Sequence, residues 1–419
     1  MNNVLIIGSG GREHALAKAF ERSPKVAKVF VVPGNAGMPS NKIECVNIGI
    51  TDFPVLRQFV AENHIALTFV GPEVPLSEGI VDDFNAHHLP IVGPTQYAAQ
   101  MESSKAFAKG VMDRANVPTA SYQSFSAKEL EKATAYLETQ SMPIVIKQDG
   151  LAAGKGVVIA QTLEEAKNTV HEMMVDLNSP VVIEEFMTGE ELSFFTLVNG
   201  EHIIPIGFAR DYKRAYDNDE GSNTGGMGAY SPLQWVDSAI EQEIMNKVLR
   251  PLLAQLVKEG TPYTGVLYAG LMQTPNGIKV IEFNARFGDP ETQILLPLIE
   301  TDFFDLVSAH LAKKQIEVKL SNKTSLGVIV AAEGYPQDYA KGMEIHFADD
   351  FPMENVCFAG VAEKDGKLTA KGGRILMVTT QQDDLISARK AVYELLEKVK
   401  IEKSFYRKDI GFGKDLLRS

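Results

Sequence analysis

Short apolar segments alternate with amphipathic segments over the first part of the chain. The apolar segments are rich in valine, isoleucine and leucine, as expected of strands that are buried on both faces of a sheet. These predicted strands are 4–7, 29–32, 67–70 and 89–92. Apolar positions at helical spacing predict helices at 13–22, 55–63 and 77–86. Strands and helices in alternation predict an α/β unit with a parallel, doubly wound sheet.

The middle of the chain has a different, α+β pattern. A predicted helix at 104–115 precedes two short apolar strands, which flank a glycine-rich loop. Asn199-Gly200 and Pro275-Asn276-Gly277 are typical of turns that join antiparallel strands. The predicted strands here are 144–147, 157–160, 181–184, 192–198, 202–208, 263–273 and 278–284, and the further helices are 163–175 and 238–259. From about 323 a small mixed α/β unit follows, with strands at 326–332 and 374–379 and a helix at 383–399.

Length and charge narrow the class of protein. A chain of 419 residues is too long for one hydrophobic core and predicts two to four domains. A net charge of −13 argues against a general surface for nucleic acid or anionic membrane, although local cationic clusters can still bind phosphorylated small molecules. The two cysteines, Cys45 and Cys357, are far apart, as in proteins of a reducing compartment. With no signal peptide and no long apolar run, we expect a cytoplasmic protein.

The most informative polar cluster lies at the end of the predicted strand 278–284. Alternation along a strand places the side chains of Glu282 and Asn284 on one face. Two oxygen donors side by side suit a hard cation such as Mg²⁺, which takes few ligands from protein and the rest from water and phosphate. Arg286 follows two residues later and is suited to clamp a carboxylate or phosphate. A strand that ends in a polar loop would explain a lone Glu-x-Asn, but the whole run through Asp289 favours a binding site.

Glycine-rich loops follow three of the N-terminal strands. The first is Gly8-Ser9-Gly10-Gly11-Arg12-Glu13-His14, and the others are 33–37 and 71–73. Backbone N–H groups at such strand-to-helix junctions bind anions. A dinucleotide fingerprint needs a third glycine where Glu13 stands, which argues against a nicotinamide site. Tight turns explain each loop alone equally well, but all three lie at the carboxyl ends of strands, where open α/β sheets bind ligands, so we favour a monophosphate site.

Two loops of the middle region also carry small and cationic residues. The loop 150–157 does not match the Walker A motif, because Gly156 follows its lysine and a strand comes next. It is suited to fold as a flap over a triphosphate, with Lys147 directed at the same phosphates, although a mobile hairpin tip explains the loop alone as well. The second loop, 223–229, follows Asp211-Tyr212-Lys213-Arg214 and favours a substrate site over a simple turn. No zinc spacing of histidines is present in the sequence.

Taken together, these motifs resemble the phosphoribosylamine–glycine ligases (glycinamide ribonucleotide synthetases), ATP-grasp enzymes of de novo purine synthesis. The resemblance runs from Ile6 to Ile410, and its most specific segments are 10–16, 149–156, 223–229 and 282–291. It implies an N-terminal domain at 1–101, a central ATP-grasp domain at 102–320 with a lid at about 118–190, and a C-terminal domain at 321–419.

The resemblance also implies roles for single residues. Those of the ATP site are Lys105, Lys147, Gly154, Lys155, Gly156, Glu184, Phe186 and Glu191. The phosphoribosylamine site would contain Gly10, Gly11, Arg12, Gly34, Asn35, Glu73, Asn223, Thr224, Gly225, Gly226 and Asp289. Glu282 and Asn284 would hold Mg²⁺ or Mn²⁺. Arg286 would hold the glycine carboxylate, with Lys213 and Asp211 beside it as further catalytic residues.

The implied chemistry matches the residues that are present. Glycine carboxylate attacks the γ-phosphorus of ATP, and the amine of 5-phosphoribosylamine then attacks the glycyl phosphate, so no protein nucleophile is required. The expected partners are these small molecules, with no nucleic acid or membrane, and a transient contact with the enzyme that supplies phosphoribosylamine. Tyr212 stands where many members have histidine, and 265–273 lacks the acid that many ATP-grasp enzymes carry on this strand.

Three alternatives compete with this interpretation. A nicotinamide oxidoreductase would need the missing glycine at position 13. A non-catalytic ATP-binding protein would have little use for Glu282, Asn284 and Arg286 together. Another ATP-grasp carboxylate–amine ligase or a carboxylating ligase is the nearest rival, and the region 211–228 argues against it.

Overall fold

The N-terminal residues form the parallel sheet that the sequence predicts. The computed structural model describes residues 1–151 and 156–412. The sheet has the strand order β3-β2-β1-β4-β5 and its pairs are parallel, with Ile6 of β1 opposite Val31 of β2 and Phe69 of β4. The strands are β1 (Asn2–Gly8), β2 (Val26–Pro33), β3 (Ile43–Cys45), β4 (Ile65–Val70) and β5 (Ile91–Val92). The helices are α1 (Gly11–Glu21), α2 (Phe53–Glu62), α3 (Glu73–Ser77) and α4 (Ile80–Ala86).

The helix expected at 77–86 is wrong in one respect. It begins only at Ile80, where α4 starts, because Gly79 adopts a left-handed backbone with φ of +91°. Ser77 is the last residue of α3, a separate helix that was not predicted. The strand β3 was not predicted, since only one of its three residues is buried and no apolar run marks it.

A second, nine-stranded sheet runs through the middle of the molecule. Its order is β16-β15-β10-β11-β14-β17-β22-β19, and β24 pairs with β17 at the side. The strands are β10 (Glu190–Asn199), β11 (His202–Asp211), β14 (Gly228–Ser231), β15 (Thr264–Thr274), β16 (Gly277–Asn284), β17 (Thr324–Ala332), β19 (Val356–Phe358), β22 (Arg374–Gln382) and β24 (Ser404–Phe405). Antiparallel pairing of β14 with β17, with Ala229 opposite Gly327, makes the C-terminal strands part of the central sheet.

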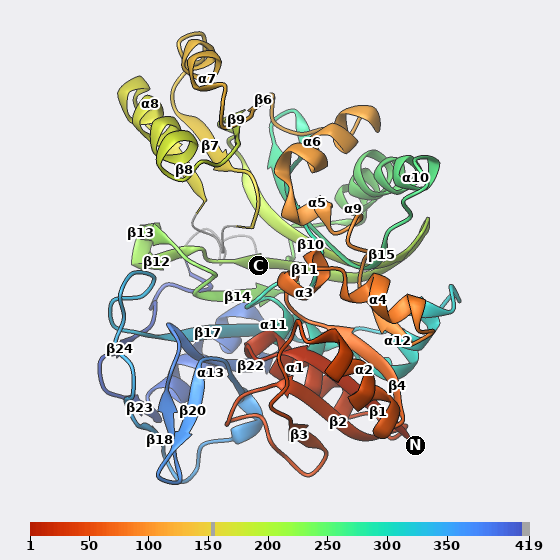
Figure 1. Cartoon of the computed structure of the whole chain (residues 1–419). Helices are drawn as coiled ribbons and strands as arrows, with labels where there is room; N and C mark the ends of the chain where they lie inside the picture. The colour runs from red at the N-terminus through yellow and green to blue at the C-terminus, as the bar shows by residue number, and fades with distance from the viewer. Residues whose placement is uncertain (152–155, 413–419) are drawn as a thin grey trace.

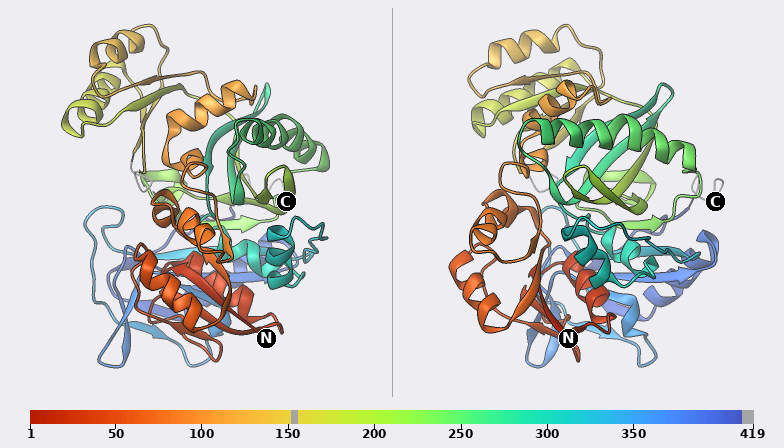
Figure 2. Two further views of the ribbon diagram at one scale, coloured as in Figure 1. Left: turned by 45° about the vertical axis from the view of Figure 1, so that its right-hand side comes forward. Right: turned by 90° about the vertical axis from the view of Figure 1, so that its right-hand side faces the viewer.

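A small unit with its own core projects from this body (Figures 1 and 2). Its sheet has the order β6-β9-β7-β8, and Phe125, Leu137, Ile146 and Val170 lie in a separate hydrophobic cluster. The strands are β6 (Tyr122–Phe125), β7 (Ile144–Gln148), β8 (Val157–Ala160) and β9 (Val181–Glu185). They are covered by α7 (Leu130–Leu137) and α8 (Leu163–His171), and the π-helical turn Glu172–Asp176 continues α8. This unit is suited to move as a body, because few core contacts join it to the rest.

The remaining helices cover the central sheet and the C-terminal strands. The long helix expected at 238–259 consists of α9 (Ser238–Ile244) and α10 (Arg250–Lys258), joined by the π-helical turn Met245–Leu249. The others are α5 (Gln100–Ser103), α6 (Lys105–Arg114), α11 (Thr292–Leu295), α12 (Phe303–Leu311) and α13 (Leu385–Leu396). Short strands complete the fold: β12 (Arg214–Tyr216), β13 (Glu220–Asn223), β18 (Ile345–Phe347), β20 (Val361–Lys364), β21 (Lys367–Ala370) and β23 (Val399–Ile401). Among the described residues, no helix is both long and apolar enough to cross a membrane.

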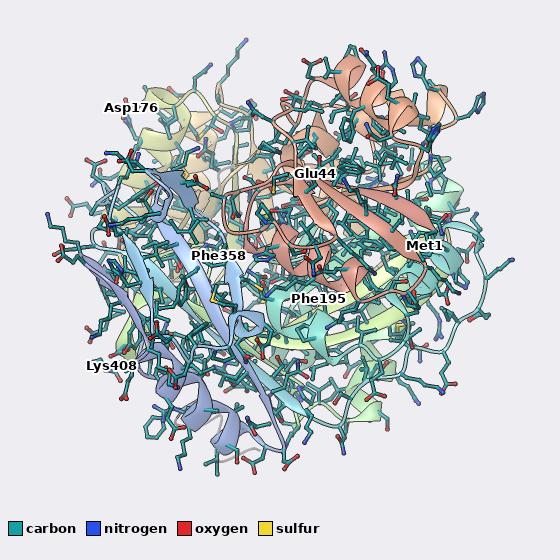
Figure 3. The ribbon with its side chains drawn as sticks, turned by 90° about the horizontal axis from the view of Figure 1, so that it is seen from below. Met1, Glu44, Asp176, Phe195, Phe358 and Lys408 are labelled. Atoms are coloured by element: carbon teal, nitrogen blue, oxygen red, sulfur yellow. The ribbon has the colours of Figure 1, made fainter. Side chains whose placement is uncertain are left out.

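Aromatic side chains join the N-terminal sheet to the central body. The ring of Phe287 lies between Phe69 of β4, with centroids 6.0 Å apart, and Phe195 of β10, with centroids 6.1 Å apart. Phe20 of α1 contacts Phe303 of α12 at 4.8 Å. Figure 3 shows the N-terminal ribbon beside the C-terminal ribbon, with Phe195 and Phe358 near this boundary. Phe287 directly precedes the Gly-Asp-Pro turn, so this packing also fixes the end of β16.

We predict that Phe69→Ala lowers the free energy of unfolding by about 3–5 kcal/mol, the usual cost of removing a buried phenyl ring. Phe69 is 1% exposed, and its ring contacts three other phenylalanines. Urea unfolding followed by circular dichroism measures the change. Ile386→Ala, at a side chain that is 63% exposed, is the control and should change stability by less than about 0.5 kcal/mol. Equal losses in the two variants would contradict the packing described above.

Candidate active site

The end of β16 brings the predicted oxygen donors together. Glu282 and Asn284 lie two residues apart on the same face of the strand, and Asn284 contributes to lowering the pKa of Glu282. Burial raises the pKa of Glu282, but Lys213, Lys147 and Lys105 together more than offset this effect, so its pKa lies below the usual value. The carboxylate is therefore ionised and surrounded by cations that lie on three other elements.

This donor set fits a hard divalent cation. One ionised carboxylate and one amide oxygen are the share that Mg²⁺ commonly takes from a protein when phosphates complete its shell. No acid faces Glu282 from the neighbouring strand, because Gly270 of β15 is its partner in the ladder. Within the described parts of the chain, no group of three or more His, Cys, Asp or Glu side chains is arranged to hold a metal by itself. A metal here would depend on ligands from the substrate.

Arg286 lies in a partly buried network of carboxylates. Its Nε donates to Glu73 Oε2 at 3.2 Å, and its Nη2 pairs with Glu102 Oε1 at 2.8 Å. The same Nη2 donates to Asn284 Oδ1 at 3.4 Å. Glu102 also accepts the Ala285 N–H at 2.8 Å. The structure thus brings together Glu73 and Arg286, which lie far apart in the sequence, and adds Glu102, which no sequence pattern marked.

The first glycine loop is shaped by Glu13. Its Oε2 accepts the Gly10 N–H at 2.7 Å, and its Oε1 pairs with Arg12 Nε at 2.5 Å. A side chain at Gly8 or Gly71 would collide with the Glu13 carboxyl group, which explains why both strand ends carry glycine. Glu13 therefore stands where a dinucleotide-binding loop has its third glycine. Its carboxylate accepts the Gly10 N–H, which could otherwise bind an anion.

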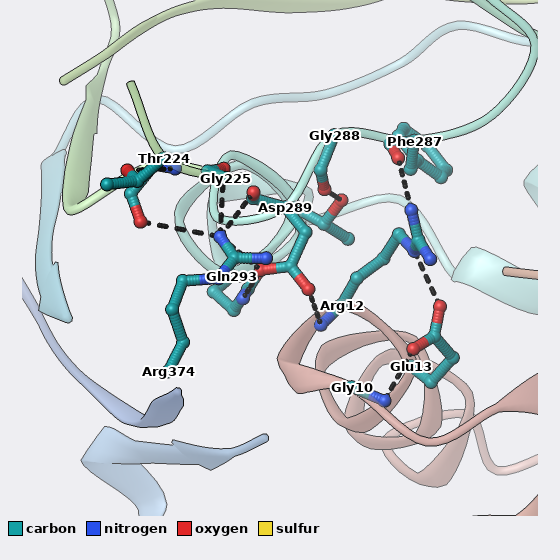
Figure 4. A network of polar contacts seen from close by, with 12 residues as sticks. Gly10, Arg12, Glu13, Thr224, Gly225, Phe287, Gly288, Asp289, Gln293 and Arg374 are labelled. Carbon is teal, nitrogen blue, oxygen red and sulfur yellow. Dashed lines mark hydrogen bonds and ion pairs between the residues drawn. The ribbon is translucent and has the colours of Figure 1, made fainter. Parts of the chain in front are cut away.

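Asp289 connects the N-terminal loop to the central sheet (Figure 4). Its Oδ2 accepts the Arg12 N–H at 3.4 Å, and its Oδ1 accepts Gln293 Nε2 at 2.8 Å. Arg374 Nη1 lies 3.4 Å from Oδ1 and donates to the main-chain oxygen of Asp289 at 2.7 Å. Burial raises the pKa of Asp289, but Arg374 and Arg12 more than compensate and keep it below the usual value. Arg374 and Gln293 were not predicted, because neither belongs to a recognisable motif.

Asp211 ends β11, and Lys213 follows it next to the glycine loop 223–226. Asp211 raises the pKa of Lys213 well above its usual value, although burial opposes it. Lys213 Nζ also lies 3.5 Å from Glu191 Oε2. The hydroxyl of Thr224 donates to Lys213 O at 2.8 Å, which fixes this loop against β11. Burial, and then the charge of Asp211, raise the pKa of Glu291 to about 7, so this side chain is a further titratable group of the site.

The charged residues predicted for the nucleotide lie where the projecting unit meets the central body, and Lys147 Nζ of β7 donates to Ile281 O of β16 at 3.2 Å. Lys147 Nζ lies 2.9 Å from Glu184 Oε2, and Lys109 Nζ lies 3.3 Å from the same oxygen. Burial lowers the pKa of Lys109 to about 8 against the opposing effect of Glu184. Lys105 Nζ donates to Gly150 O at 3.0 Å. Lys109 was not predicted, since a lysine within a helix has no distinguishing pattern.

A cavity of about 630 Å³ lies next to β8. Among the described residues that the sequence assigned to the nucleotide, Phe186 alone lines it. Its lining includes Val157, Phe186, Arg214, Asn223 and Gln337. Phe186 is 40% exposed and presents its ring at the wall. Gly156 is buried and its carbonyl accepts the Gln148 N–H at 2.7 Å. Gly154 and Lys155, which the sequence assigned to the flap, lie outside the described residues.

Gly34 and Asn35 lie away from Arg286, at the boundary with the C-terminal strands. Asn35 Nδ2 donates to Ser9 O at 2.8 Å and to Phe358 O and Ala359 O at 3.1 Å. Gly34 has φ of +65° and lies against Cys45. Asn35 thus holds the first two glycine loops of the N-terminal sheet to the C-terminal region.

Comparison with known proteins places the whole chain in one family. Models of the phosphoribosylglycinamide synthetase N domain, ATP-grasp (A) domain and C domain match residues 2–102, 103–292 and 325–413. The phosphoribosylamine–glycine ligase of Pasteurella multocida is 50% identical over 98% of this chain and 97% of its own length. That of Halalkalibacterium halodurans is 48% identical over 98% and 96%.

Solved structures agree with this result. A crystal structure of phosphoribosylamine–glycine ligase from Thermotoga maritima has a TM-score of 0.84 and 34% identity, and the match covers 97% of this chain and 100% of that one. The biotin carboxylase domain of Hydrogenobacter thermophilus 2-oxoglutarate carboxylase, solved with MgADP and bicarbonate, has a TM-score of 0.71 at 16% identity, over 97% and 91%, and shares the fold alone. The chain therefore belongs to the phosphoribosylamine–glycine ligase family, within the ATP-grasp fold.

Proposed function

We propose that this protein joins glycine to 5-phosphoribosylamine at the expense of ATP, the second step of purine synthesis. The products are N1-(5-phosphoribosyl)glycinamide, ADP and phosphate. The observation that carries the proposal is the ionised Glu282 among Lys105, Lys147 and Lys213, with the Arg286 network directly beyond the same strand. Such a site can hold a polyphosphate at one end and a carboxylate at the other.

ATP would bind between the projecting unit and the central sheet. Lys105 and Lys147 supply charge to the phosphates, and the loop carrying Gly154, Lys155 and Gly156 would cover them. Glu184, Phe186 and Glu191 would hold the nucleoside, and of these three Phe186 lines the cavity of about 630 Å³. Glu282 and Asn284 would hold Mg²⁺ or Mn²⁺, which when bound neutralises charge on the transferred phosphoryl group.

The acid and amine substrates would meet at Arg286. A glycine oxygen attacks the γ-phosphorus, ADP leaves, and glycyl phosphate is formed. The amine nitrogen then attacks the acyl carbon, the C–O bond to phosphate breaks, and the nitrogen loses a proton. Arg286 would hold the glycine carboxylate, while Lys213, kept protonated by Asp211, would stabilise the negative charge that develops on the phosphate.

Phosphoribosylamine would bind where the N-terminal loops face the central sheet. Gly10, Gly11, Arg12, Gly34, Asn35 and Glu73 lie on the N-terminal side, and Asn223, Thr224, Gly225, Gly226 and Asp289 lie opposite. We propose that residues 1–101 form the domain for this substrate, 102–320 the ATP-grasp domain with a lid at about 118–190, and 321–419 the C-terminal domain. The contact of Arg12 with Asp289 supports a shared site between the first two.

A carboxylating ligase is the second candidate, since biotin carboxylases share the fold. The loop 223–226 argues against this candidate. Thr224 fixes the loop to Lys213, whose charge acts on Glu282, so the loop lies at the proposed site. We also propose a cytoplasmic location, small molecules as the ligands, and a transient contact with the enzyme that supplies phosphoribosylamine. A net charge of −13 supports the exclusion of nucleic acid and anionic membranes.

The direct test supplies ATP, Mg²⁺, glycine and freshly generated phosphoribosylamine and measures ADP formation. We expect full turnover only with the complete mixture, because the second substrate must consume the glycyl phosphate before the enzyme can turn over. Bicarbonate in place of glycine tests the carboxylating alternative. ADP release that ignores the omission of glycine or of the amine would contradict the proposal.

Glu282→Gln should reduce kcat by at least about 10²-fold, because it removes the charge that would hold the metal on the phosphates. The thermal midpoint should change little, since the amide keeps the shape of the side chain. Glu243→Gln is the matched control: Glu243 lies by the opposite end of the same strand, where it accepts the Ile278 N–H at 3.4 Å, and its turnover should stay near that of the parent. A near-normal rate for Glu282→Gln at saturating Mg²⁺ would remove Glu282 from the metal site.

Arg286→Lys should raise the KM for glycine by about tenfold or more, with a smaller effect on the KM for ATP. Lysine keeps the charge but loses the planar fork that can grip a carboxylate through two bonds. Steady-state kinetics in each substrate measures the two constants. Because Arg286 also donates to Asn284, a rise confined to the activation constant for Mg²⁺ would instead assign Arg286 to the metal side and contradict its role toward glycine.

A further inference from the structure

One partly buried cation of the C-terminal strands, Arg374, has no role in the proposed chemistry of ATP and glycine. Arg374 is the first residue of β22, and its side chain is 20% exposed. It leaves its own sheet and enters the space between the loop 225–226 and the Asp289-Pro290 turn (Figure 4). Both of these loops belong to the proposed phosphoribosylamine site.

A single nitrogen of Arg374 joins the two loops. Nη1 donates to Gly225 O at 2.9 Å and to Asp289 O at 2.7 Å, with a longer contact to Gly226 O at 3.4 Å. The same nitrogen lies 3.4 Å from the Asp289 carboxylate. Removing this cation would leave the partly buried main-chain oxygen of Asp289 without this donor, and an unpaired acceptor there costs more than the bond itself contributes.

The composition of the loop depends on this arginine. A methyl group at Gly225 would lie 2.9 Å from Arg374 Cζ, so the guanidinium lies directly against the main chain there. Gly226 has φ of +116°, and a side chain at that position would collide with Pro290. The small residues at 225 and 226 therefore serve close packing against Arg374 and Pro290.

A second residue of the C-terminal region supports the same loop. The Gly225 N–H donates to the hydroxyl of Tyr335 at 3.1 Å. Arg374 and Tyr335 thus hold both main-chain polar groups of Gly225, its carbonyl and its N–H. Asp289 in turn accepts the N–H of Arg12 at the start of α1, so the contacts continue from the C-terminal strands to the N-terminal loop.

We infer that Arg374, supported by Tyr335, is a positioning residue that sets the distance between the 225–226 loop, Asp289 and the Arg12 loop, and thereby the affinity for phosphoribosylamine. The inference rests on the proposed function. It gives the C-terminal strands a role in recognition of the amine substrate. ATP and glycine bind, under the proposal, around Glu282, Lys147 and Arg286, and no contact of Arg374 described above involves those three residues.

The test compares the three KM values and kcat of Arg374→Gln with those of the parent. We expect the KM for phosphoribosylamine to rise by about ten- to a hundredfold, the ratio that corresponds to loss of a charge-assisted hydrogen bond. The KM values for ATP and glycine should stay within about twofold. Arg374→Lys keeps the positive charge but loses the planar guanidinium group. Its KM for phosphoribosylamine should therefore lie between those of the parent and Arg374→Gln. Tyr335→Phe should show a smaller rise in the same constant.

Arg22→Gln is the matched control. Arg22 also bonds a main-chain oxygen of another segment, with Nη2 2.9 Å from Leu296 O, but it lies at the far end of α1. The Arg22→Gln substitution should leave all three KM values unchanged. Thermal unfolding of Arg22→Gln and Arg374→Gln shows whether the stabilities of these two variants are comparable. Arg374→Gln and Asp289→Asn should also be non-additive in the KM for phosphoribosylamine, because they remove one shared contact.

The outcomes separate the inference from the function. A parent enzyme whose ADP release ignores the amine removes the proposed function and, with it, this inference. An active parent with an unchanged KM for phosphoribosylamine in Arg374→Gln overturns the inference alone. A parallel rise of all three KM values in Arg374→Gln also overturns the inference, and so does a loss of activity that follows the drop in thermal stability. Either result would show that Arg374 has a general structural role.

Discussion

The site depends on compensation of buried charge at the end of β16. Glu282 stays ionised because three lysines oppose the cost of its burial, and the partly buried Arg286 is balanced by ion pairs with Glu73 and Glu102. A buried charge without a partner would be far more costly than any of these contacts is stabilising. The partners come from different elements, so the separate parts of the chain must be in place before the charges balance.

The same arrangement explains how a reactive intermediate could survive. Glycyl phosphate reacts with water, so a site that makes it must exclude solvent until the amine arrives. The N-terminal loops, the end of the central sheet and the C-terminal strands close three sides of this region through Arg12, Asp289 and Arg374. Under the proposed function, the projecting unit, which has its own core, would be the side that opens for ATP. Rigid and mobile parts thus have different sources of stability.

Much of the fold follows from hydrophobic patterning, and the limits have physical causes. The apolar runs predicted the strands of the parallel sheet except β3, in which a single buried residue leaves no pattern. The start of α4 after Gly79 depends on one backbone angle, which periodicity does not encode. Strand alternation placed Glu282 and Asn284 together, because that relation is local. Contacts such as Arg374 with Asp289 join positions far apart in the chain, so only the folded structure reveals them.

The central claim is that glycine carboxylate is phosphorylated before the amide forms. It is tested most directly with glycine labelled with ¹⁸O in both carboxylate oxygens, followed by ³¹P NMR or mass spectrometry of the phosphate released. Because one glycine oxygen attacks the γ-phosphorus and leaves with it when the amine displaces the acyl group, the account predicts one ¹⁸O atom in each phosphate. Phosphate that is free of ¹⁸O, released together with the amide product, would contradict it.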